Sequence, residues 1–139
     1  MMSEIKEILM KTNGEGFYSL TPSIKNLVKN HWPEGNGVLT LFNTHTSCGL
    51  TINEVYAPEA ALDLEAFLKH IAPRNLAFIK HKDEGPDDSP SHMKSLLIQT
   101  SLQIFVEHGE LKMGQWQGVY LCEFRDEPKT RKILARLSS

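Results

Sequence analysis

The stretch from His81 to His92 concentrates the residue types that can do chemistry. It reads HKDEGPDDSPSH, so a histidine stands at each end and four carboxylates lie between, at Asp83, Glu84, Asp87 and Asp88. The stretch has no hydrophobic residue that could bury it. Imidazole and carboxylate groups ligate divalent metal ions and transfer protons. A solvated acidic loop that caps a helix is the alternative, but such a loop has no need of imidazole, and the two histidines favour a polar site.

A bend and a helix start are predicted to position these groups. Gly85-Pro86 indicates a turn directly before the paired carboxylates. Ser89 and Pro90 are typical of an N-cap and a first helical position, which places His92 and Lys94 in the first turns of a helix. Because His92 and Leu96 are four positions apart, we expect the face that carries His92 to point toward the core.

A second polar segment follows the apolar run 38–42, which predicts a central strand covered on both faces. It begins with His45, Thr46 and Ser47, and polar residues just past a core strand are often functional. A Thr/Ser-rich loop with one hydrogen-bonded histidine is the alternative. The apolar run 76–79 predicts another strand that leads directly into His81, so two core strands would each end in a histidine-bearing segment.

The remaining patterns predict an α+β fold, a sandwich of mainly antiparallel sheets with about three helices. Expected strands lie at 4–11 and 16–20, paired across a glycine turn, and at 50–52, 101–107, 110–113, 118–125 and 129–137. Helices are expected from Thr21 and over 58–71, the second burying Leu62, Phe67, Leu68 and Ile71. Glu123 interrupts an apolar strand, so it is either exposed on an edge or buried and paired, with Arg125 as a partner on the same face.

Composition limits the class of protein. A chain of 139 residues favours a single domain, 1–139, and 40% hydrophobic with 23% charged residues indicates a globular protein. The net charge of −2 argues against a nucleic-acid binder. No apolar run approaches the ~20 residues of a membrane helix, and the N-terminus has no signal-peptide pattern. Cys48 and Cys122 form no CxxC pair, which favours a reduced cytoplasmic protein with buried thiols.

Five short blocks, taken together and in order, resemble the YjbQ family. They are HTS at 45–47, LTINE at 50–54, HxxEGxDD at 81–88, PxHxK at 90–94 and GxWQGxYLxExR at 114–125. The resemblance spans about residues 37–134. Cys48 stands where alanine is usual in the family and Gln115 where threonine is common, and neither change removes a candidate ligand.

The resemblance implies a fold, an assembly and an activity. The fold is a compact α+β sandwich that assembles as a homotrimer, with a site built from the histidine segments that is sometimes read as a metal site. The activity is that of a secondary thiamine-phosphate synthase, which joins a hydroxymethylpyrimidine diphosphate to a thiazole phosphate and releases pyrophosphate. The expected partners are therefore a small phosphorylated or heterocyclic substrate and further copies of the chain, without nucleic acid or membrane.

Site roles can be assigned on this basis. We expect the imidazoles of His45, His81 and His92 to converge on one cavity and hold a divalent metal ion or an anionic ligand, with zinc as the expected metal and a fourth position open. The alternative is three separate histidines, each satisfied by a local hydrogen bond. Catalytic roles, as bases, orienting groups or charge stabilisers, are assigned to Glu54, Asp87, Asp88, Lys94 and Glu123, with Asp87, Asp88 and Lys94 at the rim. Substrate contacts are assigned to Thr46, Ser47, Asn53, Trp116 and Gln117. His31, His70 and His108 receive no site role.

Two other functions remain open from the residues. A metal-dependent hydrolase would use a metal-bound water against a phosphoester or amide, with Asp87 or Asp88 as base. A non-enzymatic trimer would only bind a small molecule. The trimer itself is also expected because strand 118–125 is apolar on both faces, with Tyr120, Cys122 and Phe124 opposite Val119 and Leu121.

Overall fold

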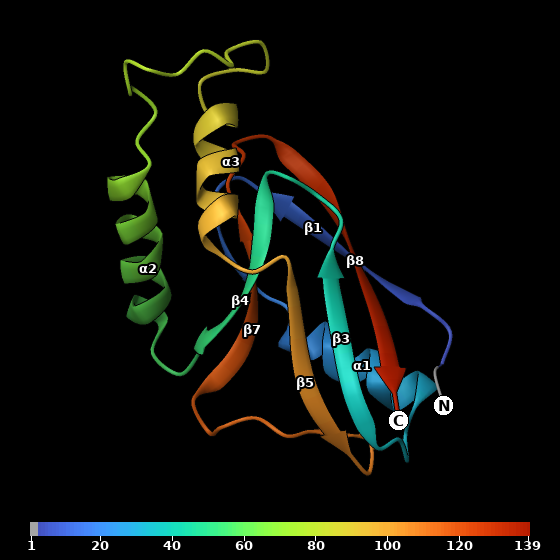
Figure 1. Ribbon diagram of the computed structural model, residues 1–139. Helices are drawn as coiled ribbons and strands as arrows, with labels where there is room; N and C mark the ends of the chain where they lie inside the picture. Colours follow the sequence, from blue (N-terminus) through green and yellow to red (C-terminus); the bar gives the residue numbers. More distant parts are fainter. Residues whose placement is uncertain (1–2) are drawn as a thin grey trace.

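Two antiparallel β-sheets and three helices make up the fold in the computed structural model, which describes residues 3–139 (Figure 1). The elements in order are β1 (Lys6–Asn13), β2 (Gly16–Ser19), α1 (Thr21–His31), β3 (Gly37–Asn43), β4 (Cys48–Glu54), α2 (Pro58–Ile71), α3 (Asp88–Leu97), β5 (Ser101–Glu107), β6 (Glu110–Leu111), β7 (Gln117–Glu123) and β8 (Pro128–Ser138). The expected α+β class is confirmed.

The strands divide into a five-stranded sheet, ordered β1-β8-β3-β5-β6, and a three-stranded sheet, ordered β2-β7-β4. The expected hairpin between the first two strands is wrong, because β1 pairs with β8 and β2 with β7. The glycine turn between them, where Gly14 has φ +101°, carries the chain from one sheet to the other instead of folding it back. A glycine-containing turn alone does not distinguish these two outcomes.

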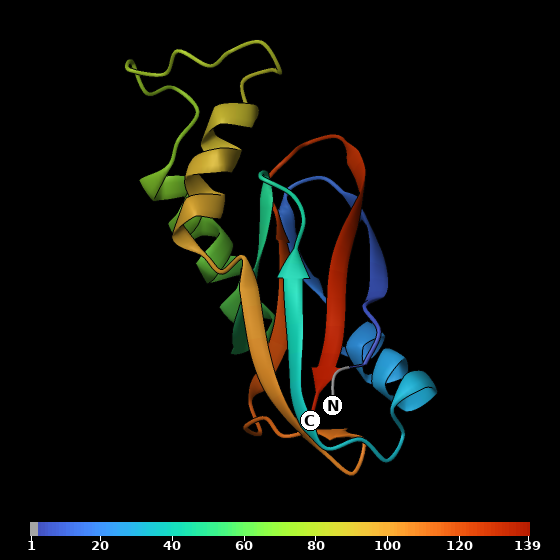
Figure 2. The same cartoon turned by 45° about the vertical axis from the view of Figure 1, so that its right-hand side comes forward.

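The main core lies between the two sheets. Alternate residues of β5 point inward, and Leu39 and Leu41 of β3 meet Val119 and Leu121 of β7 there. Helix α1 packs against β1, β6 and β7 and adds the fully buried Ile24 and Val28. Figures 1 and 2 place α1 on the opposite side of the molecule from α2 and α3.

A second apolar cluster forms on the other face of the three-stranded sheet. Tyr120, Cys122 and Phe124 project from β7 and its C-terminal end and pack with Leu68 of α2 and Ile98. Strand β7 is thus covered on both faces within one chain, so its two apolar faces do not call for a neighbouring subunit. This removes the argument by which the sequence alone favoured a trimer.

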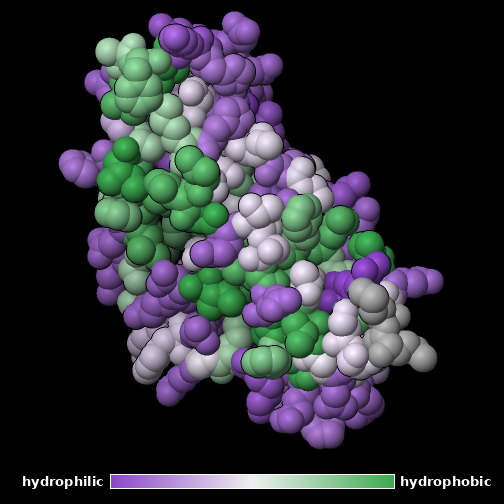
Figure 3. Space-filling model, viewed as in Figure 1, coloured by the Kyte–Doolittle hydropathy of each residue, from purple (hydrophilic) through white to green (hydrophobic). Residues whose placement is uncertain are grey.

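The outer face of the five-stranded sheet has no such cover from residues 3–139. Phe42 of β3 and Phe105 of β5 are exposed there, so the expectation that strand 38–42 is covered on both faces does not hold for a single chain. Figure 3 shows apolar side chains gathered over β3, β5 and β8. An apolar cavity of about 230 Å³ lies on this face, and Ile5, Phe42 and Leu134 line it.

Two local expectations are wrong in the segment between α2 and α3. Residues 76–79 form no strand but part of a long loop between the helices, and Phe78 is 69% exposed because no sheet edge lies beside this run. Helix α3 begins at Asp88, with Asp87 in the N-cap position, because the Asp87 carbonyl accepts the Ser91 N–H at 3.0 Å. Ser89 therefore lies inside the helix.

The apolar residues of both helices are only partly buried. Leu68 is the buried residue of α2, whereas Leu62, Phe67 and Ile71 are exposed, contrary to expectation. Leu96 of α3 is 82% exposed, so the helix face that carries it does not point into the core. Both helices lie on one face of a narrow three-stranded sheet, which cannot cover a wide apolar stripe. No helix in the described residues is both long and apolar enough to cross a membrane.

The end of α3 is fastened to β4 at a glycine. Leu50 and Gln99 exchange backbone hydrogen bonds of 2.8 and 3.0 Å, which form an isolated antiparallel bridge. Ile98 packs directly over Gly49, and a Cβ at this glycine would collide with the Ile98 side chain. The absence of a side chain at residue 49 therefore sets how closely α3 approaches the sheet.

Candidate metal centre

His81, His92 and Asp88 come together at the N-terminal end of α3. The Asp88 Oδ2 atom lies 2.7 Å from Nε2 of His81 and 3.1 Å from Nε2 of His92. All three ligand atoms lie within 4.8 Å of one another, and the two rings are 5.6 Å apart at their centroids. The Asp88 carboxylate is buried and the imidazoles are partly exposed, so the group opens toward solvent.

Local structure explains how these three residues meet. Asp88 and His92 lie four positions apart on α3 and so share one face of its first turns. His81 comes from the loop between α2 and α3, which extends beyond both helices (Figure 1). Gly85, at φ +104°, turns that loop back toward the helix, and its N–H is donated to the Lys82 carbonyl at 3.4 Å. The expected bend at Gly85-Pro86 is confirmed.

Arg125 fixes the orientation of both paired carboxylates. Its Nη1 donates to Asp88 Oδ1 at 2.7 Å, which leaves Asp88 Oδ2 to face the imidazoles. Its Nε donates to Asp87 Oδ2 at 2.9 Å, and this oxygen also accepts the Asp126 N–H at 2.9 Å. Burial alone raises the pKa of Asp87, but these hydrogen bonds and the Arg125 charge outweigh it, and the pKa is lowered.

Asp88 thus belongs to the centre itself and Asp87 lies buried beside it, and neither is at an exposed rim, where the sequence placed them. Asp87 and Asp88 are 6% and 3% exposed, because ion pairing with the buried Arg125 draws them inward. Arg125 was expected to pair with Glu123 on the same strand face. It was missed as part of the site because its partners are 37 and 38 positions away in sequence.

The hydrogen bonds of His92 place its second ring nitrogen against a carboxylate. His92 Nδ1 lies 2.8 Å from the carbonyl oxygen of Thr46, which can only accept, so Nδ1 carries the proton. In the neutral ring Nε2 is then unprotonated, yet it lies 3.1 Å from the acceptor Asp88 Oδ2. Two acceptors at this distance require a cation between or upon them, either a second ring proton or a metal ion.

The donor set fits a divalent metal ion. Two imidazole nitrogens and one carboxylate oxygen are a common three-ligand set for zinc with the fourth position open. The carbonyl of Thr46 and the guanidinium of Arg125 hold His92 and Asp88 from behind, as outer-shell partners of ligands do. The expected metal ligands His81 and His92 are therefore brought together, with Asp88 as the third donor.

The structure does not bring His45 into this group. Its Nε2 accepts the backbone N–H of Lys132 on β8 at 2.8 Å. Burial and the nearby Arg131 charge lower the pKa of His45, which favours the neutral ring with its proton on Nδ1. The sequence could not show that β8 runs beside residue 45 and that a backbone N–H of this strand donates to the His45 ring. Only the next residue, Thr46, reaches the centre, through its carbonyl oxygen.

Glu123 and Ser47 belong to a buried network next to the centre. Glu123 is fully buried and pairs with Arg131, whose Nε and Nη2 donate at 2.8 and 2.5 Å. Thr12 of β1 also donates to Glu123, and Arg131 Nη2 donates to the Ser47 hydroxyl at 2.8 Å. Of the two open alternatives the buried, paired one is confirmed, but with Arg131 in place of Arg125. Ser47 is buried and engaged here, not exposed toward a phosphate.

Lys94 is buried on α3, contrary to its expected place at the rim. It is 2% exposed, and its ammonium donates to Glu15 at 2.7 Å and lies 5.7 Å from the centre of the Phe124 ring. Arg74 extends this network, since it approaches Glu15 at 3.4 Å and binds Asp126 through two contacts of 2.6 Å. Glu15 and Arg74 carried no signal in the sequence.

The other four assigned residues lie at the far end of the three-stranded sheet. Glu54 pairs in register with Gln117, whereas Cys48, next to the centre, pairs with Glu123. A seven-residue strand separates these ends by roughly 20 Å at about 3.3 Å per residue. At that far end Asn53 is exposed, and the Glu54 carboxylate accepts the Ala57 N–H. The Gln117 side chain accepts the Gly114 N–H. The Trp116 ring packs edge-on against Tyr56, with 4.6 Å between the ring centroids. Strand length thus keeps them from the histidines of the same chain.

Comparisons with known proteins agree with this fold. The family described as UPF0047 protein YjbQ-like matches residues 6–139. The UPF0047 protein YjbQ of Salmonella typhimurium is 37% identical over 132 residues, which cover 95% of each chain. A conserved hypothetical protein of Thermus thermophilus superposes with a TM-score of 0.86 at 35% identity, over 96% of this chain and 99% of its own. An uncharacterised Clostridium acetobutylicum protein gives 0.83 at 33% identity, over 96% of this chain and 99% of its own.

Proposed function

The chain belongs to the YjbQ-like UPF0047 family, and from this premise we propose that it is a metal-dependent transferase of the thiamine-phosphate synthase type. In that reaction a thiazole-phosphate nitrogen attacks the methylene carbon of a hydroxymethylpyrimidine diphosphate. A C–N bond forms, the C–O bond to the diphosphate breaks, and pyrophosphate leaves. The observation that supports a metal centre most directly is the convergence of two imidazole nitrogens and an Asp88 oxygen within 4.8 Å of one another.

Each residue of the centre has a distinct part in this proposal. His81, His92 and Asp88 hold the ion, with zinc as the expected occupant. When bound, a divalent ion supplies a Lewis acid that stabilises the charge of a departing diphosphate. Arg125 holds the Asp88 carboxylate in place, and the Thr46 carbonyl orients the His92 ring so that Nε2 faces the position the ion would take. The partly exposed imidazoles leave space for a substrate on the solvent side.

A hydrolase with the same ion is a second candidate, but the carboxylates favour the transferase. The expected hydrolytic bases, Asp87 and Asp88, are both ion-paired to Arg125 and buried. A group held this way is a poor general base, because taking up a proton would break its ion pair. Displacement by a nitrogen lone pair requires no proton removal. It therefore suits a centre whose carboxylates are all engaged.

We also propose that the protein works in the cytoplasm as a homotrimer. Two buried cysteines without a disulfide suit a reducing compartment. The uncovered apolar residues of the five-stranded sheet, among them Phe42 and Phe105, support association. So does Arg136 on the same sheet, whose Nε is buried without a hydrogen-bond partner in the described residues.

A turnover assay tests the function. Zinc-loaded protein is incubated with hydroxymethylpyrimidine diphosphate and thiazole phosphate, and thiamine phosphate and pyrophosphate are both quantified. Equal formation of the two products, lost in His92→Ala and kept in His70→Ala, is the expected result. A parallel panel of simple phosphoesters and amides tests the hydrolase. Absence of turnover on every substrate would reject both enzymes in favour of a trimer that only binds a small molecule.

A further inference from the structure

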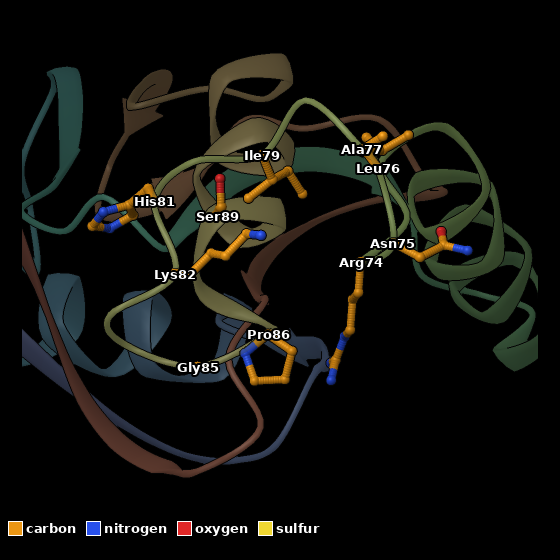
Figure 4. A pocket seen from close by; sticks show the side chains of 10 residues that line it. All are labelled: Arg74, Asn75, Leu76, Ala77, Ile79, His81, Lys82, Gly85, Pro86 and Ser89. Carbon is orange, nitrogen blue, oxygen red and sulfur yellow. The ribbon is translucent and has the colours of Figure 1, made fainter.

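A cavity of about 450 Å³ lies next to the centre, between the loop that carries His81 and the start of α3. Its volume is within the usual range for sites that bind small molecules. His81 forms part of its wall, so an occupant would lie within reach of the ring whose Nε2 contacts Asp88. Figure 4 shows His81 and Ser89 at one side of this space and Arg74 at the other.

The wall of the cavity is basic. Arg74, His81 and Lys82 line it, and among the described residues no aspartate or glutamate does. This is unexpected in a loop that contains four carboxylates. Asp87 and Asp88 are turned away because both are bound to Arg125 beneath the loop. The local sequence is acidic, but the surface that it presents to the cavity is not.

Lys82 is the lining cation whose charge is not compensated. Arg74 is held by the two oxygens of Asp126, and His81 contacts Asp88. Lys82 has neither an ion pair nor a side-chain hydrogen bond within residues 3–139. In Figure 4 the exposed side chain of Lys82 extends between Ser89 and Pro86 along this open cavity, so its ammonium can meet an occupant without first breaking a contact.

The rest of the wall supplies an apolar surface and a hydroxyl. Leu76, Ile79 and Pro86 contribute carbon surface, and Ser89 contributes its hydroxyl on the side of His81. An occupant that fits this lining has an anionic group beside an apolar or ring-shaped body. Phosphate and carboxylate are the two common groups with that charge.

We propose that this cavity is a subsite for a small organic anion, whose charged group binds Lys82 and Ser89 and whose body packs on Leu76, Ile79 and Pro86. The proposal rests on the proposed function, since it places a substrate beside the metal centre. It adds the part of the site that selects for charge. Lys82 and Ser89 are then substrate-binding residues that the sequence motifs did not single out, although both lie within the block 81–92.

Binding of simple probes tests the subsite. Phenyl phosphate and benzoate distinguish the two anionic groups, and benzyl alcohol is the uncharged control, each titrated into the full-length protein by calorimetry or ligand-observed NMR. We expect at least one anion to bind wild-type protein and benzyl alcohol to bind much more weakly. Lys82→Ala should weaken that anion about tenfold, as expected for one charge-assisted contact, and Lys82→Arg should largely restore it. Lys80→Ala is the matched control, since Lys80 is exposed on the same loop outside the cavity.

The metal-site variant separates failure of the subsite from failure of the proposed function. His92→Ala should lose the metal yet still bind the anion through Lys82, whereas Lys82→Ala should keep the metal. Anion binding that is equal in wild type and Lys82→Ala, or equal for the anions and benzyl alcohol, overturns the subsite. Anion binding without metal or turnover in wild type leaves the subsite standing and rejects the transferase.

Discussion

The Nδ1 atom of His92 lies 2.8 Å from the carbonyl oxygen of Thr46, a residue 46 positions earlier in the chain. This contact joins the first turns of α3 to the loop between β3 and β4. It also sets which nitrogen of His92 carries the proton, and so which nitrogen faces Asp88. The centre therefore depends on the sandwich, even though its three ligand atoms come from residues 81–92.

Single substitutions should separate the ligands of the ion from His45. His81→Ala, His92→Ala and Asp88→Asn should each weaken zinc binding at least tenfold, because each removes one of three donors. His45→Ala should keep the metal, since its Nε2 is occupied by the Lys132 N–H. Metal content after dialysis, measured by mass spectrometry, gives the answer, with His70→Ala as control. Equal loss in His45→Ala and His92→Ala would restore the three-histidine centre expected from the sequence.

Removing the charge of Glu123 should destabilise the fold strongly. Glu123→Gln leaves the buried Arg131 guanidinium without its counter-charge, and breaking a buried ion pair in this way costs about 3–5 kcal/mol. Lys69→Ala is the control, because its ion pair with Glu65 is on the surface and worth less than about 0.5 kcal/mol. Urea unfolding followed by circular dichroism measures both. A Glu123→Gln loss as small as that of the control would show that the pair contributes little.

Acid should destabilise the protein through its paired carboxylates. Burial raises the pKa of Glu123, but hydrogen bonds from Arg131 and Thr12 outweigh it and the pKa falls below the ordinary 4.5. The pKa of Asp126 is lowered from 3.8, mainly by Arg74. Because these pKa values are lower in the folded protein, the two carboxylates contribute their full stabilisation above the ordinary pKa values. That stabilisation is lost as the pH falls through the lowered pKa values of the folded protein. Urea midpoints should therefore drop steeply below about pH 4.5. A profile that is flat from pH 5 to pH 3 would contradict this.

Both cysteines should be reduced, separate and slow to react. The structure confirms that Cys48 and Cys122 are unbonded and buried, and burial raises the pKa of Cys48 to about 12. Two thiols per chain should react with a disulfide reagent in denaturant without reductant, and almost none in native buffer. A native protein that reacts at once, or a denatured one without free thiols, would count against the buried, reduced state.

The solution mass should be about three times the chain mass of 15.7 kDa. Phe42→Glu should shift it toward the monomer, because it places a charge on the uncovered face of the five-stranded sheet. Phe78→Glu is the matched control, since Phe78 is also an exposed phenylalanine, even more exposed than Phe42, but lies on the loop between α2 and α3. Light scattering after size exclusion measures the mass. A monomer at micromolar concentration would reject the trimer.

Local patterns in the sequence predicted most of the elements but not how they pair. Helix α1, strand β5 and strand β8 follow from apolar periodicity and turn residues. The run 76–79 has the same apolar character as a strand but has no neighbour to pair with, and a sequence shows only the first property. The β1–β2 hairpin failed in the same way, since a glycine turn can also change sheets.

The same distinction between local pattern and long-range pairing applies to the site. His81, Asp88 and His92 belong to one short segment, so the sequence could place them together. Two other contacts depend on where β8 runs. The Lys132 N–H donates to His45 Nε2, and Arg131 pairs with Glu123. Asn53 and Gln117 lie in the motif blocks of the family but at the other end of their strands. A place in a family motif block therefore did not tell whether a residue lies near the histidines.

Gly49 gives a last consequence, for the way this fold can vary over evolution. Its missing side chain lets Ile98 lie against β4, and Ile98 directly follows the helix that carries Asp88 and His92. A larger residue at position 49 would collide with the Ile98 side chain, so the chain directly after that helix could no longer pack in the same way. Under the proposed function, selection for the metal centre would thus also act at a glycine that is not one of its ligands. Drift at this glycine should be as rare as drift at the histidines themselves.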